Sequence, residues 1–195
     1  MRIRMQYLIT VQSLCRVLLG TLLATPAFGI DQPYPGPFVE NDDMLMVLMP
    51  HTPEQIAAFY EARGFPREAL ELISKACFVT VHIENKSNRV IWLETADWRL
   101  SSNKQTLRRL GKDHWDTRWD EINLPLANRS TFVWTQLPVQ RDLQPDEPVG
   151  GNIVLKGDIS KFNLEARFLT GRDKRGGMLE VRFQDIECPE EEPRQ

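Results

Sequence analysis

The chain has 195 residues, of which 42% are hydrophobic and 26% are charged, and its formal net charge is −3. This length suits one ordinary domain, and the composition excludes a disordered or collagen-like chain. The mildly acidic balance argues against nucleic acid or anionic lipid as the main partner.

The first 29 residues have the pattern of a bacterial export signal. Three arginines accompany a short apolar run, VLLGTLLA, over residues 17–24, and the small residues Ala27 and Gly29 occupy the positions that a signal peptidase reads. The alternative is an uncleaved anchor, which needs about 20 apolar residues, but polar side chains at residues 12–16 interrupt the stretch. The sequence therefore predicts a signal peptide over 1–29, a periplasmic or secreted location, and no stable membrane span after cleavage.

The cysteine count supports this location. Removal of residues 1–29 would take away Cys15 and leave Cys77 and Cys188, with a net charge of −6. An even number of cysteines in an oxidising compartment favours a disulfide. The alternatives are free buried thiols or metal ligands, but no CxxC or Cys/His cluster supports a metal. A bridge that closes a loop of roughly 110 residues would stabilise the fold by about 4–5 kcal/mol in the chain-entropy model.

The segment after the signal contains a polar stretch followed by an apolar one. Residues 30–43 are rich in proline and acidic residues and predict an extended leader. Residues 44–50, MLMVLMP, form a short apolar run that is typical of a buried strand.

Residues 53–76 predict a helical hairpin. Thr52 and Gln55 have the spacing of a capping box, and Pro53 suits the first helical position. Gly64 is placed to end the first helix, and Pro66 begins a second.

From residue 77 the pattern changes from helical spacing to alternation. In CFVTVHIE, Cys77 and every second residue after it face one way, which predicts a strand. The turn NKSN at 85–88 predicts a hairpin with the following strand, RVIWLE. Several more short strands are expected, and they include TFVWTQL at 131–137 and a final hairpin of 162–169 with 178–186.

These strands predict a mainly β protein. We expect a single immunoglobulin-like antiparallel β-sandwich over residues 44–188, with a short N-terminal α-helical hairpin and a polar tail at 189–195. The stretch LQPDEPVGGNIVL resembles the late strands of immunoglobulin-like sandwiches. The chain lacks a tryptophan between paired cysteines at antibody spacing, so it is not a true immunoglobulin domain.

Catalytic motifs are missing from the sequence. No GxSxG, HExxH or P-loop pattern is present, so we predict no catalytic residues and no cofactor. One alternative is a small periplasmic hydrolase that uses His114 with Asp113 and Asp116, although such a pair also needs a positioned nucleophile.

The methionine-rich segment offers a second alternative, metal handling. Met44, Met46, Met49 and His51 are ligands that suit cuprous ion. In a regular strand, however, Met49 points away from the face that Met44 and Met46 share. The surrounding residues look like buried core, where methionine is an adaptable filler. The sequence therefore predicts no metal site.

Residues 113–122, DHWDTRWDEI, contain the candidate partner or ligand face. Trp115 and Trp119 would stack on one side of a short helix. They would form an aromatic platform for a glycan or an envelope protein. The rim would comprise Asp116, Arg118 and Asp120. The alternative is a lid that closes one end of the sandwich core. The other tryptophans lie in strand-like runs and are expected in the core: Trp92, Trp98 and Trp134.

Taken together, these patterns predict an exported, non-catalytic binding or assembly module of the bacterial cell envelope. Its candidate partner is an envelope protein or a glycan, not nucleic acid.

The export interpretation predicts a mature chain that begins at Ile30. Intact mass spectrometry of the protein recovered from the periplasm or medium of an expressing bacterium should give the mass of residues 30–195. A mass that retains Met1 to Gly29 would contradict signal cleavage.

Overall fold

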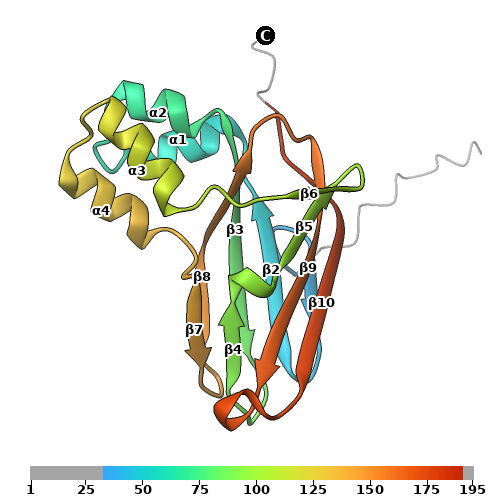
Figure 1. The fold of residues 1–195 in the computed structure, drawn as a ribbon. Helices are drawn as coiled ribbons and strands as arrows, with labels where there is room; N and C mark the ends of the chain where they lie inside the picture. Colours follow the sequence, from blue (N-terminus) through green and yellow to red (C-terminus); the bar gives the residue numbers. More distant parts are fainter. Residues whose placement is uncertain (1–32, 191–195) are drawn as a thin grey trace, which may run out of the picture. The chain divides into compact units, whose positions relative to one another are not determined.

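The computed structural model describes residues 33–190, which form two antiparallel sheets and four helices (Figure 1). The predicted signal at 1–29 and residues 191–195 of the predicted tail lie outside the described residues. The protein is therefore mainly β, as its sequence predicts. Two short 3-10 turns lie at Thr95–Asp97 and Arg172–Lys174.

The first sheet has the strand order β1-β2-β3-β8. Its strands are β1 (Phe38–Glu40), β2 (Met44–Pro50), β3 (Ala76–Asn85) and β8 (Pro148–Lys156). The predicted leader is only partly correct, because β1 pairs with β2 and Phe38 lies opposite Val47.

The second sheet is centred on β9 (Lys161–Thr170). Strand β10 pairs with one edge of β9, while β4 and β5 share the other edge. The remaining strands are β4 (Ile91–Glu94), β5 (Arg99–Ser102), β6 (Gln105–Leu107), β7 (Gln140–Leu143) and β10 (Met178–Glu187).

A single apolar core lies between the sheets. The predicted alternation of β3 is confirmed, because Cys77, Val79, Val81 and Ile83 all face this core. The second sheet contributes side chains such as Phe168 from β9, and β2 contributes Met44, Met46 and Leu48. Burial of these side chains is the main driving force for packing the sheets face to face.

The predicted hairpin of β3 with the strand that follows it is wrong. Strand β4 pairs with β7 and β9, so the turn after Asn85 carries the chain from one sheet to the other. The Asn85 side chain is fully buried at this crossing, and its amide donates to the carbonyl oxygens of Arg89 and Leu143. Turn residues mark a reversal in the sequence but do not specify which sheet the next strand joins.

The predicted final hairpin is correct. Met178 of β10 lies opposite Leu169 of β9, and the pairing continues to Glu187 and Lys161. A register shift between Phe183 and Ile186 marks a bulge, which keeps both side chains in the core.

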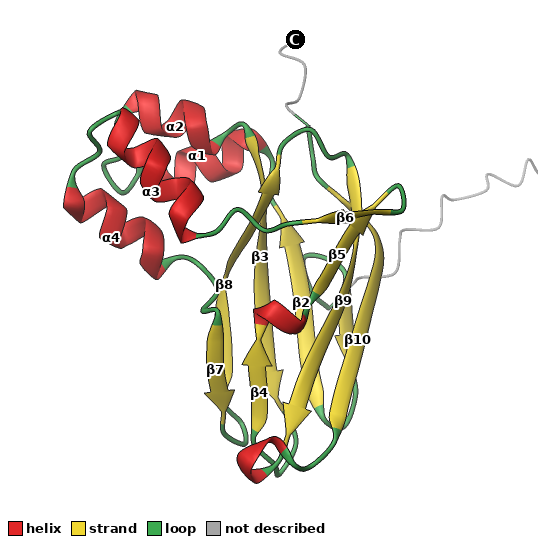
Figure 2. Ribbon diagram, viewed as in Figure 1, coloured by secondary structure: helices red, strands yellow, loops and turns green. Residues whose placement is uncertain are grey.

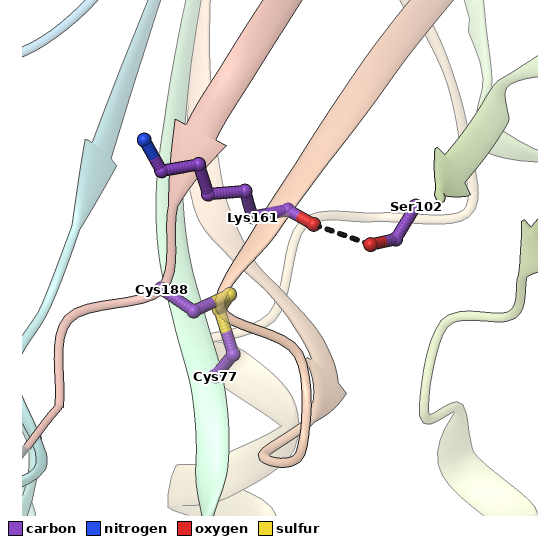
Figure 3. Close-up of a disulfide and its surroundings, with 4 residues drawn as sticks. All are labelled: Cys77, Ser102, Lys161 and Cys188. Atoms are coloured by element: carbon purple, nitrogen blue, oxygen red, sulfur yellow. Dashed lines mark hydrogen bonds between the residues drawn. A yellow bond between two sulfur atoms is a disulfide. The ribbon is translucent and has the colours of Figure 1, made fainter. Parts of the chain in front are cut away.

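A disulfide joins Cys77 of β3 to Cys188, which follows β10 (Figure 3). It closes a sequence separation of 111 and ties the two sheets together at one end. Near the bridge, the Ser102 hydroxyl donates to the carbonyl oxygen of Lys161 at 2.6 Å, which fastens β5 to β9.

The helical hairpin consists of α1 (Pro53–Glu61) and α2 (Arg67–Ile73). The predicted capping box is confirmed: Thr52 accepts from the backbone of Gln55, whose side chain accepts from the backbone of Thr52. Gly64 has a φ of 75°, which a residue with a side chain adopts at a cost.

Two further helices are α3 (Lys112–Glu121) and α4 (Leu126–Trp134). Helix α4 corrects the prediction of a strand at 131–137. The run TFVW has strand-forming composition, but packing of Phe132 against other aromatic rings holds the segment helical.

A second apolar core lies between the helices and the outer face of the first sheet. Figure 2 shows the four helices gathered beside β3 and β8. From the sheet, Phe78 and Val154 point away from the sandwich core and into the helices. The helices contribute mainly Ile56, Tyr60, Ile73, Trp119 and Phe132.

Candidate functional site

The indoles of the predicted platform are buried. Trp115 is 4% exposed and Trp119 is 1% exposed, and the two rings stack with centroids 5.0 Å apart. Both pack on Phe132 of α4. They therefore cannot form a surface for a partner. The alternative of a lid on the sandwich core also needs correction, because they cover the outer face of the first sheet. Arg118 is exposed and pairs with Glu121.

Trp134, which was expected in the core, is instead an exposed aromatic residue. Its side chain is 87% exposed at the end of α4. Leu126 (78% exposed) and Val133 (50% exposed) lie on the same helix. Exposure of half or more of three large apolar side chains on a nine-residue helix is costly unless something covers them.

These three side chains border a groove of about 410 Å³ between α3 and α4. On α4, the polar residues Arg129 and Ser130 lie between Leu126 and Val133 and also line the groove. The α3 wall of the groove consists of Lys112, Asp116 and Asp120, which recur every four residues and so lie on one face of the helix. Two of the predicted rim residues, Asp116 and Asp120, therefore do border an exposed indole, but the indole belongs to α4.

The charges of this groove are paired internally. Lys112 forms an ion pair with Asp116, and Arg129 forms one with Asp120. Arg129 also donates to the carbonyl oxygens of Trp119 and Leu124, so it fixes α4 against the end of α3. The groove consequently has a polar α3 wall and a mixed α4 wall with three apolar side chains, and its charges balance across the two walls. We call these two walls, with Trp134, the α3–α4 surface.

A sequence signal for this surface exists. Pro125 precedes Leu126, and a proline directly before a run of helix formers is typical of a helix start. From Leu126, the positions i, i+7 and i+8 give the exposed apolar stripe. The aromatic and β-branched residues at 131–134 have high strand propensity, so local composition favours a strand there.

A hydrogen-bonded chain of polar groups lies at the base of the helices. The Thr80 hydroxyl donates to Oδ1 of Asn152 at 2.6 Å, so it accepts a hydrogen bond from Nε2 of His51 at 2.7 Å. His51 is thus a donor to this hydroxyl and not its base. The geometry is that of a structural contact between β2, β3 and β8, and it does not activate Thr80 as a nucleophile.

His114 lies on α3 without the acid partner that a hydrolase would need. Within residues 33–190, no carboxylate hydrogen-bonds to its ring, and Asp116 is engaged by Lys112. Partial burial lowers the pKa of His114 below its usual value, and the nearby Arg118 and Lys156 add to this effect. The structure does not bring together the residues of the hydrolase alternative.

The methionine-rich strand β2 is divided between two faces. Met44 and Met46 are fully buried in the sandwich core, whereas Met49 faces the other side of the sheet beside Thr80. His51 is held by Thr80, as described above. These side chains do not converge on one point, so the arrangement gives no support to metal handling.

Within residues 33–190, no helix is both long enough and apolar enough to cross a bilayer. The same residues contain no group of three or more His, Cys, Asp or Glu side chains arranged to hold a metal ion.

No protein-family model matches the chain, and no curated protein matches it significantly. Among solved structures, the ycdA protein of Bacillus subtilis, provisionally classed as a lipoprotein, is similar to it with 10% identity and a TM-score of 0.42. That match covers 77% of this chain but only 39% of the ycdA protein. The yjhA protein of Bacillus subtilis matches at 12% identity and a TM-score of 0.37, covering 67% of this chain and 77% of its own. TM-scores below 0.5 do not establish a common fold, so these likenesses say nothing about function.

The contact of His51 predicts a pH dependence of stability. Burial lowers the pKa of His51 below its usual value of 6.5. The unfolded chain therefore binds a proton at a higher pH than the folded chain does. The stability that depends on neutral His51 is fully present above about pH 6.5. It is lost as the pH falls from there toward the lowered pKa of the folded state.

We expect the free energy of unfolding to decrease between about pH 7 and pH 5, and to decrease less in a His51→Gln variant, whose amide can still donate to Thr80. Urea unfolding at a series of pH values measures both slopes. His114 titrates in both proteins and cancels in the comparison. Equal slopes in the two proteins would contradict the prediction.

Proposed function

We propose that this protein is an exported, non-catalytic binding module whose α3–α4 surface docks a partner protein of the bacterial envelope. The observation that carries the proposal is the exposure of Trp134 on a well-packed helix. Tryptophan is enriched among the side chains that dominate protein interfaces, and it loses little conformational entropy on binding. The disulfide and the N-terminal signal pattern support export.

The chemistry of the α3–α4 surface favours a protein over a charged ligand. Its acidic and basic groups neutralise one another, so it offers no net attraction for an anionic or cationic partner. The apolar stripe from Leu126 to Trp134 spans eight residue steps, or about 12 Å of helix. A stripe of this length and spacing suits an amphipathic helix laid along the groove, with apolar side chains facing Val133 and Trp134.

We further propose that the two-sheet core is of the immunoglobulin-like kind. In support, both sheets are antiparallel, they share one core, and a disulfide joins them. The helical layer is then an addition to the outer face of the first sheet, and it displays the binding surface.

The proposal predicts that a photo-crosslinking residue at Ser130, inside the groove, forms an adduct with another protein in the native envelope. The same residue at Met178, which is also exposed and apolar but lies on β10, should form no such adduct. A Trp134→Ala substitution should reduce the Ser130 adduct at least tenfold, because it removes the largest apolar contact. Mass spectrometry of the crosslinked bands measures these yields.

Three results would overturn the proposal. Equal adducts from positions 130 and 178 would mean non-specific contact. An adduct that contains only a second copy of the chain would mean self-association. Binding of purified cell-wall glycan that is lost in the Trp134→Ala variant, without any protein adduct, would mean a carbohydrate platform.

A further inference from the structure

Basic side chains from three elements surround a second hollow, of about 420 Å³, on the opposite side of α3. Lys75 lies just before β3, and Lys156 ends β8. The register places Ala76 opposite Lys156, so the two lysines are at the same end of the first sheet. His114 and Arg118 lie one turn apart on α3 and complete the basic lining.

Two of these cations have no counterion. Within residues 33–190, no carboxylate lies within ion-pair distance of Lys75 or Lys156. Arg118 is offset by Glu121, and Asp158 is the acidic residue that lines the hollow. The hollow therefore keeps a net positive charge in a chain whose overall charge is negative.

The floor of the hollow is apolar. It consists of Leu72, Ala76, Leu110 and the edge of Trp115. The buried indole nitrogen of Trp115 has no hydrogen-bond partner, which leaves a free donor at this end of the helical core. Apolar walls with a few convergent polar groups are typical of small-molecule sites.

A larger hollow of about 710 Å³ lies next to this one, beside the disulfide. The two share Lys75, Ala76, Gly157 and Asp158. The larger hollow adds apolar lining from Pro53, Ala57 and Ile159 beside the disulfide, and it also adds the carboxylates of Glu54 and Glu190. We call the two adjacent hollows the channel: it is basic at the α3 end, and at the disulfide end it combines apolar side chains with Glu54 and Glu190.

We propose that this channel binds a small amphiphilic anion. Its carboxylate or phosphate group lies between Lys75 and Lys156, where unpaired ammonium groups donate charge-assisted hydrogen bonds. Its apolar body lies over Ala76 toward the disulfide. Asp158 offsets part of the charge at the α3 end, and Glu54 and Glu190 at the disulfide end repel a second negative charge, so the site suits an anion with a single charge, held at the α3 end. The α3–α4 surface is not involved, because Lys112, Asp116 and Asp120 face away from His114 and Arg118 on the helix.

The test titrates the purified protein with hexanoate and hexyl phosphate, and with acetate and neutral hexanamide as comparisons. We expect saturable one-to-one binding of at least one hexyl anion by calorimetry. Acetate should bind severalfold more weakly because it lacks the apolar body, and hexanamide should not bind because it lacks the charge. The anion that binds more tightly identifies the head group.

Two variants locate the site. A Lys75→Gln/Lys156→Gln double variant should bind the hexyl anion at least tenfold more weakly. Lys104→Gln, a change at an exposed lysine that is also without an ion pair but lies in the β5–β6 turn, should bind like the wild type. Thermal unfolding of each variant checks that the fold is retained.

The ring of His114 gives an independent readout by NMR. Arg118, Lys156 and Glu121 already influence its charge, and Lys75 and Asp158 line the same hollow. A bound anion should raise the pKa of His114, because negative charge favours the imidazolium. The proposal is overturned if neither hexyl anion binds saturably, if binding survives in the double variant, if hexanamide binds equally well, or if the pKa of His114 stays unchanged.

Discussion

The apolar outer face of β3 and β8 is the constraint on which the rest of the structure depends. Phe78 and Val154 point away from the sandwich core and would face water in a bare two-sheet protein. The helices cover them with a layer of aromatic rings, of which Tyr60, Trp119 and Phe132 are almost completely buried. The helices and the outer face of the first sheet therefore stabilise each other by burying apolar side chains against one another.

The second sheet has no comparable need for cover. Its outer face carries a cross-strand network of ion pairs between β9 and β10, in which Glu165 and Glu180 contact Arg167 and Arg182. Alternation of charged and apolar residues lets one face of an antiparallel sheet stand in water. The helices therefore gather on one sheet alone, and α4, which packs Phe132 against Phe78, leaves Leu126, Val133 and Trp134 exposed.

The layer also explains the location of the second candidate site. Trp115 of α3 is buried in the helical core. One face of α3 then borders α4, and the opposite face borders the ends of β3 and β8. The α3–α4 surface has balanced charges, and the channel near the disulfide has unpaired lysines. One helix can therefore contribute to two surfaces of different chemistry.

Local patterns in the sequence were enough to predict much of the fold. The alternation in β3, the capping box of α1 and the glycine-rich turn before β10 each involve residues close in sequence, and all three are present. The partner of β4 and the helical state of residues 131–134 were not predicted, because distant residues decide them. The same limit applies to the tryptophans: packing against Phe78 and Phe132 determines that Trp115 is buried while Trp134 is exposed.

The most direct test compares Trp119→Ala with Trp134→Ala in chemical unfolding. The structure predicts that loss of the Trp119 ring, which is buried in the helical core, costs about 3–5 kcal/mol of unfolding free energy. Loss of the exposed Trp134 ring should change it by less than about 0.5 kcal/mol. A large loss for Trp134→Ala, or equal losses for both, would contradict a helical layer that buries one indole and displays the other.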